Sequence, residues 1–281
     1  MDIIRNIPDL RIYRKKINPN FRIGLVPTMG ALHEGHATLA QASVKENDLT
    51  IVSIFVNPTQ FGPNEDFERY PRDLEKDARM LAGLGVDAIF APSTQEVYPA
   101  KAQFYFDIKD LDQKLCGASR PGHMNGVVQV VSILFHLVQP THAYFGLKDY
   151  QQCRIIQTLV EELHFPLEVV PCPIIRENDG LAMSSRNVYL NPEEREQALF
   201  LSQTLNAIQA RRSEFSSINE IQNFVLKELD KFPLVKLDYF EVLNGKTLED
   251  LSSLDPSFQP HLFIAAYLGK TRLIDNMAFG D

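Results

Sequence analysis

Two histidines three residues apart, His33 and His36, carry the clearest chemical signal in the sequence. They lie in the segment VPTMGALHEGH. The apolar run 23–26 predicts a buried strand that stops at Pro27, and a helix is predicted to begin near Gly35. A strand that leads through a glycine turn into a helix N-terminus presents backbone N–H groups to an anion, most often a phosphate. Imidazoles placed there can bind a triphosphate and stabilise the charge that builds on its α-phosphate.

Two other interpretations of this histidine pair stay open. A zinc pair is disfavoured because HExH differs from the HExxH spacing and no third ligand is evident. Two ordinary surface histidines would show the same spacing, so the pair needs support from other segments.

Two further segments contain groups suited to phosphate. Met183–Arg186 has two hydroxyls and a guanidinium, which could close over a triphosphate, although serine at this position could equally cap a helix. Gly146–Asp149 follows a predicted strand, and Lys148 could supply a point charge. Alternatively, Gly146–Asp149 is the ordinary start of a helix, with Asp149 at the positive end of the helix dipole.

Neutral side chains suited to a small substrate lie in other predicted loops and helices. Gln60 follows a strand and is a candidate for gripping a hydroxyl or carboxylate, while Gln151 and Gln152 follow Gly146–Asp149. The loop that contains Arg120 and His123 could line a substrate site or be an exposed hinge. The remaining histidines are interpreted as structural: His136, His142, His164 and His261.

The positions of these segments follow from a repeated strand–helix pattern that predicts an α/β fold with a Rossmann-like, doubly wound parallel sheet. Strands are expected at 21–26, 49–56, 86–90, 104–108, 142–145 and 167–170, and helices within 1–20 and at 35–46, 72–84, 127–138 and 148–163. Ligands of such sheets bind beyond the carboxyl ends of the strands, where the polar segments described above occur.

The pattern changes after about residue 176. Charged helical stretches at 192–212 and 218–231 are followed by strand-like stretches at 234–242, 262–268 and 271–274. We therefore expect two domains: residues 1–175 bind nucleotide and small substrate, and residues 176–281 form a smaller α+β domain that acts as a lid.

The composition of the chain and its N-terminal sequence indicate what kinds of partner and which cellular compartment to expect. A net charge of −8 and a pI near 5.4 disfavour a nucleic-acid-binding surface. The three cysteines form no CxxC pair and are expected to be buried thiols in a reducing compartment. The N-terminus lacks the features of a signal peptide and no apolar run reaches the length of a membrane span, so we expect a cytoplasmic protein.

Together these motifs resemble a known family. PTMGALHEGH is similar to the HIGH-type signature of the nucleotidylyltransferase superfamily, and MSSRN is similar to its KMSKS-type loop. FVNPTQFGPNEDFERYPR, PGHMNGVVQVV, GLKDYQQ and DGLAMSSRNVYL resemble segments of the pantothenate synthetase family, whose members are pantoate–β-alanine ligases. The resemblance runs from about residue 3 to about residue 276. Leu147 is a departure, since that family often has a polar residue there.

The resemblance implies an ATP-dependent reaction in two steps. ATP and (R)-pantoate give pantoyl adenylate and pyrophosphate, and β-alanine then attacks the adenylate to give pantothenate and AMP. It also implies Mg²⁺ with the ATP, a homodimer, and no nucleic-acid or membrane partner. The nucleophile of each step belongs to a substrate, so no catalytic triad is required.

The resemblance also assigns site residues. His36 takes the proton-donor role, and Gln60 and Gln152 bind the acid substrate, Gln60 also meeting β-alanine. ATP is assigned to Met29, Gly30, Ala31, Leu32, His33, Glu34, Gly35, His36, Gly146, Leu147, Lys148, Asp149, Ile175, Met183, Ser184, Ser185 and Arg186. No metal ligand is identified, and Asp73 and Asp77 are considered for that role only because they lie near Arg72.

Three other functions share parts of this pattern. Another nucleotidylyltransferase would release pyrophosphate and stop. An aminoacyl-tRNA synthetase-like enzyme would need a basic RNA-binding surface, and the residues after 176 are few and acidic. A nucleotide sensor would have no need of His33, His36, Lys148 and Arg186 together.

Overall fold

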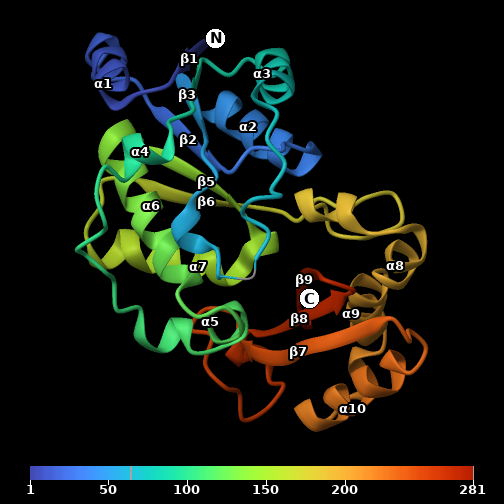
Figure 1. Cartoon of the computed structure of the whole chain (residues 1–281). Coiled ribbons are helices and arrows are strands. Elements are labelled where there is room, and N and C mark those ends of the chain that lie inside the picture. Colours follow the sequence, from blue (N-terminus) through green and yellow to red (C-terminus); the bar gives the residue numbers. More distant parts are fainter. Residues whose placement is uncertain (64, 281) are drawn as a thin grey trace. The chain divides into compact units, whose positions relative to one another are not determined.

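The computed structural model describes residues 1–63 and 65–280 (Figure 1). This described chain divides into two compact units. The first contains Met1–Leu147 and Gln152–Pro173, and the second contains Lys148–Gln151 and the chain from Ile174 onward. The four residues 148–151 therefore group with the C-terminal part of the chain, although 147 residues precede them.

The first unit is built on a parallel sheet whose strands, within the described residues, have the order β1-β4-β3-β2-β5-β6. The strands are β1 (Asp2–Ile4), β2 (Ile23–Thr28), β3 (Leu49–Ile54), β4 (Ala88–Phe90), β5 (His142–Gly146) and β6 (Glu168–Cys172). The α-helices numbered up to α7 are α1 (Ile7–Lys16), α2 (Glu34–Glu46), α3 (Leu74–Gly83), α4 (Thr94–Val97), α5 (Leu115–Ser119), α6 (His123–Val138) and α7 (Tyr150–Glu162).

The direction in which the chain moves across this sheet decides which face each helix covers. From β2 the chain steps to β3 and β4 in one direction, whereas β5 and β6 lie on the other side of β2. Because parallel crossovers are right-handed, α2 and α3 must cover one face and α6 and α7 the other. The apolar contacts agree, since Leu39 and Leu81 from α2 and α3 pack against Val26, Val52 and Ile89 of the sheet. The carboxyl ends of β2 and β5 therefore lie at the switch point where ligands bind.

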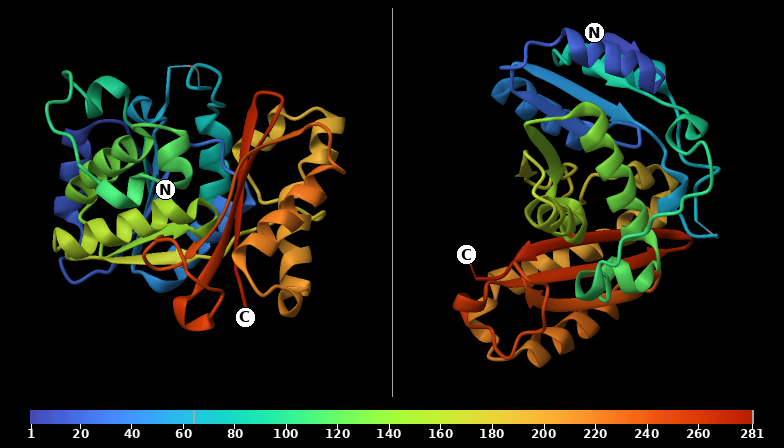
Figure 2. Two further views of the ribbon diagram at one scale, coloured as in Figure 1. Left: turned by 90° about the horizontal axis from the view of Figure 1, so that it is seen from below. Right: turned by 90° about the vertical axis from the view of Figure 1, so that its left-hand side faces the viewer.

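The second unit is a three-stranded antiparallel sheet, among its described residues, with the order β7-β8-β9. Its strands are β7 (Val235–Asn244), β8 (Pro260–Leu268) and β9 (Thr271–Ala278), and its helices are α8 (Pro192–Gln197), α9 (Phe200–Ala210) and α10 (Ile218–Leu229). Figure 2 shows α9 and α10 along one face of this sheet, where Leu205, Ile221 and Ile264 are fully buried. Short 3₁₀ helices lie at Pro58–Gln60 (η1), Lys109–Asp112 (η2), Leu147–Asp149 (η3), Ser185–Tyr189 (η4), Arg212–Glu214 (η5) and Pro256–Phe258 (η6).

The predicted fold class, a doubly wound parallel sheet with a smaller α+β part, is confirmed, but three local predictions are wrong. Residues 104–108 form no strand, and β1 was not predicted. The first long strand does not stop at Pro27, because β2 continues to Thr28 opposite Ile54. Proline is tolerated there because the pairing of β2 with β5 is registered only at Gly24 and Leu25. Among the described residues, no helix has the length and apolarity needed to cross a bilayer.

Candidate active site

The turn between β2 and α2 places the two histidines at the head of α2. His33 is the N-cap residue, and its Nδ1 accepts a hydrogen bond from the Gly35 backbone N–H at 3.2 Å. His36 Nδ1 accepts from the His33 backbone N–H at 3.4 Å, and the two ring centroids lie 4.1 Å apart. Because both Nδ1 atoms accept, a neutral ring must carry its hydrogen on Nε2. Each neutral ring thus has an N–H at Nε2, the kind of donor that suits a phosphate oxygen.

A carboxylate from α3 fixes the turn that precedes these histidines. Asp77 accepts the backbone N–H of Ala31 at 3.0 Å and that of Leu32 at 2.9 Å, and only 2% of Asp77 is exposed. Burial raises the pKa of Asp77 above its ordinary value, although the two loop N–H groups act in the opposite direction. Gly30 has φ +83°, and a Cβ there would meet Ile54 and Asp77 at 3.0 and 3.1 Å, so the turn requires glycine.

These contacts also bear on the tentative metal ligands. Both oxygens of Asp77 accept loop N–H groups, and Asp73 caps α3 by accepting from the Lys76 backbone N–H at 3.0 Å. Within residues 1–63 and 65–280 there is no cluster of three or more His, Cys, Asp or Glu side chains that could hold a metal ion. Asp73 and Asp77 thus hold backbone N–H groups of α3 and of the loop before α2.

Gln60 lies beside the same turn. Its Nε2 contacts Met29 Sδ at 3.0 Å, and its Oε1 accepts from Asn57 Nδ2 at 3.2 Å. Asn57 Nδ2 also donates to the Gly126 carbonyl at 3.0 Å, which ties the loop to α6. Because Asn57 donates to Oε1, the orientation of the Gln60 amide is fixed. The structure therefore brings Gln60 together with Met29, two residues that the sequence assigns to different ligands.

Arg120 and His123 hold the backbone of Gln60. Arg120 makes a two-point ion pair with Glu65, at 2.7 and 2.5 Å, and its NH1 contacts His123 Nε2 at 2.9 Å. His123 Nδ1 lies 2.8 Å from the Gln60 carbonyl oxygen. A guanidinium can only donate and a carbonyl can only accept, so His123 is neutral with its hydrogen on Nδ1. Pro121 and Gly122 of this loop are exposed, whereas only 14% of the Arg120 side chain is exposed, so Arg120 itself does not fit an exposed hinge.

This ion pair also affects the acidity of Glu65. Burial alone would raise its pKa, but the hydrogen bonds and positive charge of Arg120 outweigh burial and hold the pKa below its ordinary value. Glu65 is therefore ionised at neutral pH and keeps Arg120 in place.

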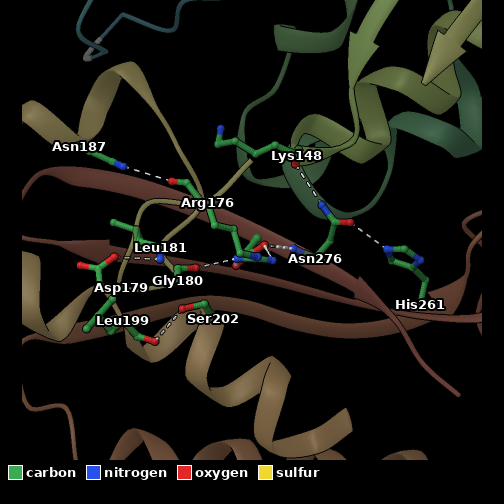
Figure 3. Close-up of polar contacts among 12 residues, drawn as sticks. Lys148, Arg176, Asp179, Gly180, Leu181, Asn187, Leu199, Ser202, His261 and Asn276 are labelled. Carbon is green, nitrogen blue, oxygen red and sulfur yellow. Dashed lines mark hydrogen bonds and ion pairs between the residues drawn. The ribbon is translucent and has the colours of Figure 1, made fainter. Parts of the chain in front are cut away.

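Of the residues assigned to ATP beyond the histidine turn, Gly146 and Leu147 lie in the first unit and the others lie in the second. Lys148 Nζ lies 3.7 Å from Asp149 Oδ1, and Asn276 Nδ2 donates to the Lys148 carbonyl at 3.1 Å (Figure 3). The Ile175 carbonyl accepts the backbone N–H of Met183 at 2.9 Å, which orders the start of the MSSR segment, Met183–Arg186.

The MSSR segment is followed by a polar cluster that anchors it. Ser184 Oγ accepts from the Arg186 backbone N–H at 3.2 Å, so the helix-cap interpretation holds for this serine. Asn187 donates to Glu177 at 2.6 Å, and Arg195 pairs with both Glu177 and Asp179 at 2.7 Å. Hydrogen bonding from Arg195 lowers the pKa of Asp179. The segment is therefore braced from its C-terminal side.

The predicted site residues fall into two sets, one in each unit. The first unit holds Met29 to His36, Gln60, Gly146, Leu147 and Gln152, and the second holds Lys148, Asp149, Ile175 and Met183 to Arg186. Sequence reasoning missed the supporting side chains Asp77, Asp275 and Asn276. No local pattern marks them, because each contacts a segment at least 45 residues away.

Comparison with known proteins places the chain in a family. The profile described as pantoate-beta-alanine ligase matches residues 2–278. Curated pantothenate synthetases from Clostridium botulinum (strain Kyoto / Type A2) and Fervidobacterium nodosum are each 48% identical, with 99% of this chain and 99% of each relative covered.

Solved structures agree. Pantothenate synthetase from Thermus thermophilus has a TM-score of 0.92 at 42% identity, with 99% of both chains covered. Pantoate-beta-alanine ligase from Francisella tularensis, complexed with beta-gamma ATP and beta-alanine, has a TM-score of 0.84 at 37% identity, with 99% of this chain and 97% of that chain covered. The resemblance seen in the motifs, the predicted fold class and the prediction of a ligase are all confirmed. This chain belongs to the pantoate-beta-alanine ligase family.

Proposed function

We propose that this enzyme condenses (R)-pantoate with β-alanine at the expense of ATP and that pantoyl adenylate is the intermediate. One observation carries the proposal: His33 and His36 cap α2 through Nδ1 and thereby present Nε2–H donors at the carboxyl end of β2. Family membership, and the beta-gamma ATP and beta-alanine bound in the Francisella tularensis structure, support the choice of substrates.

In the first step a pantoate carboxylate oxygen attacks the α-phosphorus of ATP, and the bond to pyrophosphate breaks. In the second step the amine of β-alanine attacks the acyl carbon, the bond to AMP breaks, and the amine loses a proton. Neither step needs a protein nucleophile. The enzyme supplies orientation and charge stabilisation, with His36 as the proton donor and His33, Lys148, Ser184, Ser185 and Arg186 on the phosphates.

The acid substrate is assigned to Gln60 and Gln152. The support for Gln60 is its fixed amide: Asn57 holds Oε1, one Nε2 hydrogen meets Met29 Sδ, and the other points where it can meet a substrate oxygen. The backbone of the same residue is held by His123 at 2.8 Å. A fixed donor costs little ordering when the substrate binds, which favours affinity.

Mg²⁺ is proposed to arrive with ATP, since this cation prefers phosphate and water oxygens and keeps several waters. The described residues offer no cluster of three metal-binding side chains, and Asp73 and Asp77 are occupied by backbone N–H groups. We therefore assign the ion no protein ligand and derive no step from it.

The remaining proposals concern organisation. Residues 1–175 are proposed to bind nucleotide and pantoate, and residues 176–281 to act as a lid.

A homodimer is supported by Phe104 and Tyr105, which are 85% and 70% exposed, more than a monomer surface favours for adjacent aromatics. Sedimentation of wild type and Phe104→Ser tests this: a monomeric wild type would refute the dimer. A cytoplasmic location is supported by the three cysteines, which are all buried thiols.

The deciding experiment measures AMP and pyrophosphate release from ATP, Mg²⁺ and (R)-pantoate with and without β-alanine. AMP and pantothenate that form only with all components support the ligase. Pyrophosphate from pantoate alone, with no amide after β-alanine is added, would mean that the adenylate reacts with another amine. ATP binding without either product would refute the assignment of pantoate.

A further inference from the structure

Two neighbouring residues of β9, Asp275 and Asn276, reach two segments that the proposed function assigns to ATP. Successive residues of a strand point to opposite faces of the sheet, so these side chains leave β9 in opposite directions. Both are buried, with exposed fractions of 3% and 5%. Figure 3 shows Asn276 between Lys148 and His261, and Arg176 beside Gly180.

Asn276 holds the segment that contains Lys148. Its Nδ2 donates to the Lys148 carbonyl at 3.1 Å. Because a carbonyl can only accept, this bond fixes the amide orientation and turns Oδ1 toward His261, whose Nε2 lies at 2.9 Å. His261 Nε2 must therefore carry a hydrogen. The imidazole of a histidine predicted to be merely structural thus contacts the amide that holds Lys148.

A second anchor fixes the same segment two residues later. The Tyr150 ring lies 4.2 Å from the His261 ring between centroids, and the Tyr150 hydroxyl donates to the Gly245 carbonyl at 3.0 Å. Lys148 and Tyr150 are therefore tied to β8 and β9 through His261 and Asn276. These contacts explain why residues 148–151 group with the second unit.

Asp275 holds the other segment. It pairs with the two terminal guanidinium nitrogens of Arg176, at 2.6 and 2.9 Å, and Arg176 NH1 also donates to the Gly180 carbonyl at 3.0 Å. Arg176 forms an antiparallel bridge with Ala182, the residue directly before Met183. The ion pair therefore closes the turn from which the MSSR segment emerges.

We propose that Asp275 and Asn276 are positioning residues that fix the two ATP-binding segments of the second unit, Lys148–Asp149 and Met183–Arg186, to one strand. The proposal rests on the proposed function for the identity of the ligand. A triphosphate presents its oxygens at set distances, so holding a lysine and an arginine from separate segments on one sheet lowers the ordering cost of binding. Asp275 and Asn276 act through these segments and need not touch ATP.

Two substitutions test the proposal, each with a matched control. Asn276→Asp preserves shape and the acceptor toward His261, but places an oxygen against the Lys148 carbonyl. Its control is Asn244→Asp, because Asn244 Nδ2 donates to the Phe258 carbonyl at 2.8 Å in the same unit. Asp275→Asn weakens the Arg176 pair, and its control is Asp238→Asn, since Asp238 pairs with Arg272 at 2.8 Å in the same sheet.

The readouts are the KM values for ATP and pantoate, and backbone hydrogen exchange in the full-length enzyme. We expect each β9 variant to raise the KM for ATP about fivefold to tenfold, as the loss of a buried hydrogen bond predicts, with an unchanged KM for pantoate. Exchange should quicken over 147–151 in Asn276→Asp and over 176–186 in Asp275→Asn. Both controls should match wild type in every readout.

Three results would overturn the proposal: folded β9 variants with wild-type KM for ATP and wild-type exchange, equal rises in both KM values, or the same changes in the controls. If Asn276→Asp fails to fold, Asn276→Ser, which removes the amide without adding a charge, takes its place under the same criteria. If wild type forms no adenylate, the proposed function fails. Hydrogen exchange and affinity for a non-hydrolysable ATP analogue then still decide whether Asp275 and Asn276 position the two segments.

Discussion

Replacement of His36 by alanine should separate catalysis from folding. The bond from the His33 N–H to His36 Nδ1 is long, at 3.4 Å, so its loss should cost stability only at the low end of a cap, about 0.5 kcal/mol. His36 Nε2–H, in contrast, is proposed to donate where charge builds in the transition state. Removal of one such donor slows a reaction by about 100-fold to 1,000-fold, which corresponds to about 2.7–4 kcal/mol of barrier.

The assay is pantoate-dependent release of pyrophosphate in a single turnover, which isolates adenylate formation, together with thermal unfolding of the same samples. His136→Ala is the matched control, because His136 lies in the last turn of α6, where its Nδ1 contacts the Ser132 carbonyl oxygen at 3.0 Å. It should keep wild-type adenylation. His36→Gln should recover part of the rate, since its side-chain amide can place an N–H near the position of Nε2.

A folded His36→Ala enzyme that forms adenylate at close to the wild-type rate would remove His36 from the reaction. A loss of rate that accompanies a large loss of stability would contradict the assignment of the histidine to a weak cap. The first result would refute the reasoning from the Nδ1 contacts to an Nε2–H donor, and the second would refute the estimate of the cap's contribution.

Three other predictions concern the surroundings of Gln60 and the second domain. Gly126→Ala drives a Cβ into the Thr59 carbonyl and should lower the free energy of unfolding by about 1–3 kcal/mol in denaturant melts, whereas Gly83→Ala, with no atom within 4 Å, should not. The folded pKa of Glu65 lies below its ordinary 4.5, so the Arg120 pair contributes stability above that pH and loses it as pH falls through the folded pKa. The free energy of unfolding measured in urea should therefore fall more steeply below pH 7 in wild type than in Glu65→Gln. Parallel pH profiles of the two proteins would contradict the pairing. Scattering profiles should change when ATP and pantoate are added, and unchanged profiles would refute the lid.

The fold could be predicted from sequence wherever a residue's local pattern was set by its burial. The run 49–56 is apolar except at Thr50 and Ser53 because β3 is covered on both faces. Ala37, Ala40 and Val44 recur at helical spacing because one face of α2 packs on the sheet. The same reasoning failed at 104–108, where three consecutive aromatics, Phe104–Phe106, imitate a strand. Phe104 is 85% exposed, and no strand forms there.

The site could be predicted only as far as its motifs are continuous in sequence. The histidine pair and the glycine turn are local, so their types and spacing were informative. The contacts that fix them are not local: Asp77 reaches Leu32 across 45 residues, and Asn276 reaches Lys148 across 128. Since a single sequence shows no pairing between distant positions, Asp77 was considered only as a metal ligand and Asn276 not at all.

The grouping of residues 148–151 with the second unit has a consequence for how the gene can be divided. A fragment that ends at Pro173 would keep Tyr150 but lose Gly245 and His261, the partners of its hydroxyl and its ring. A fragment that begins at Ile174 would lose the Tyr150 ring from His261 and keep only the Phe263 ring beside it. Neither half is expected to fold to its present structure alone, so a chimera of two relatives joined at this boundary should be stable only if the Tyr150 contacts are kept.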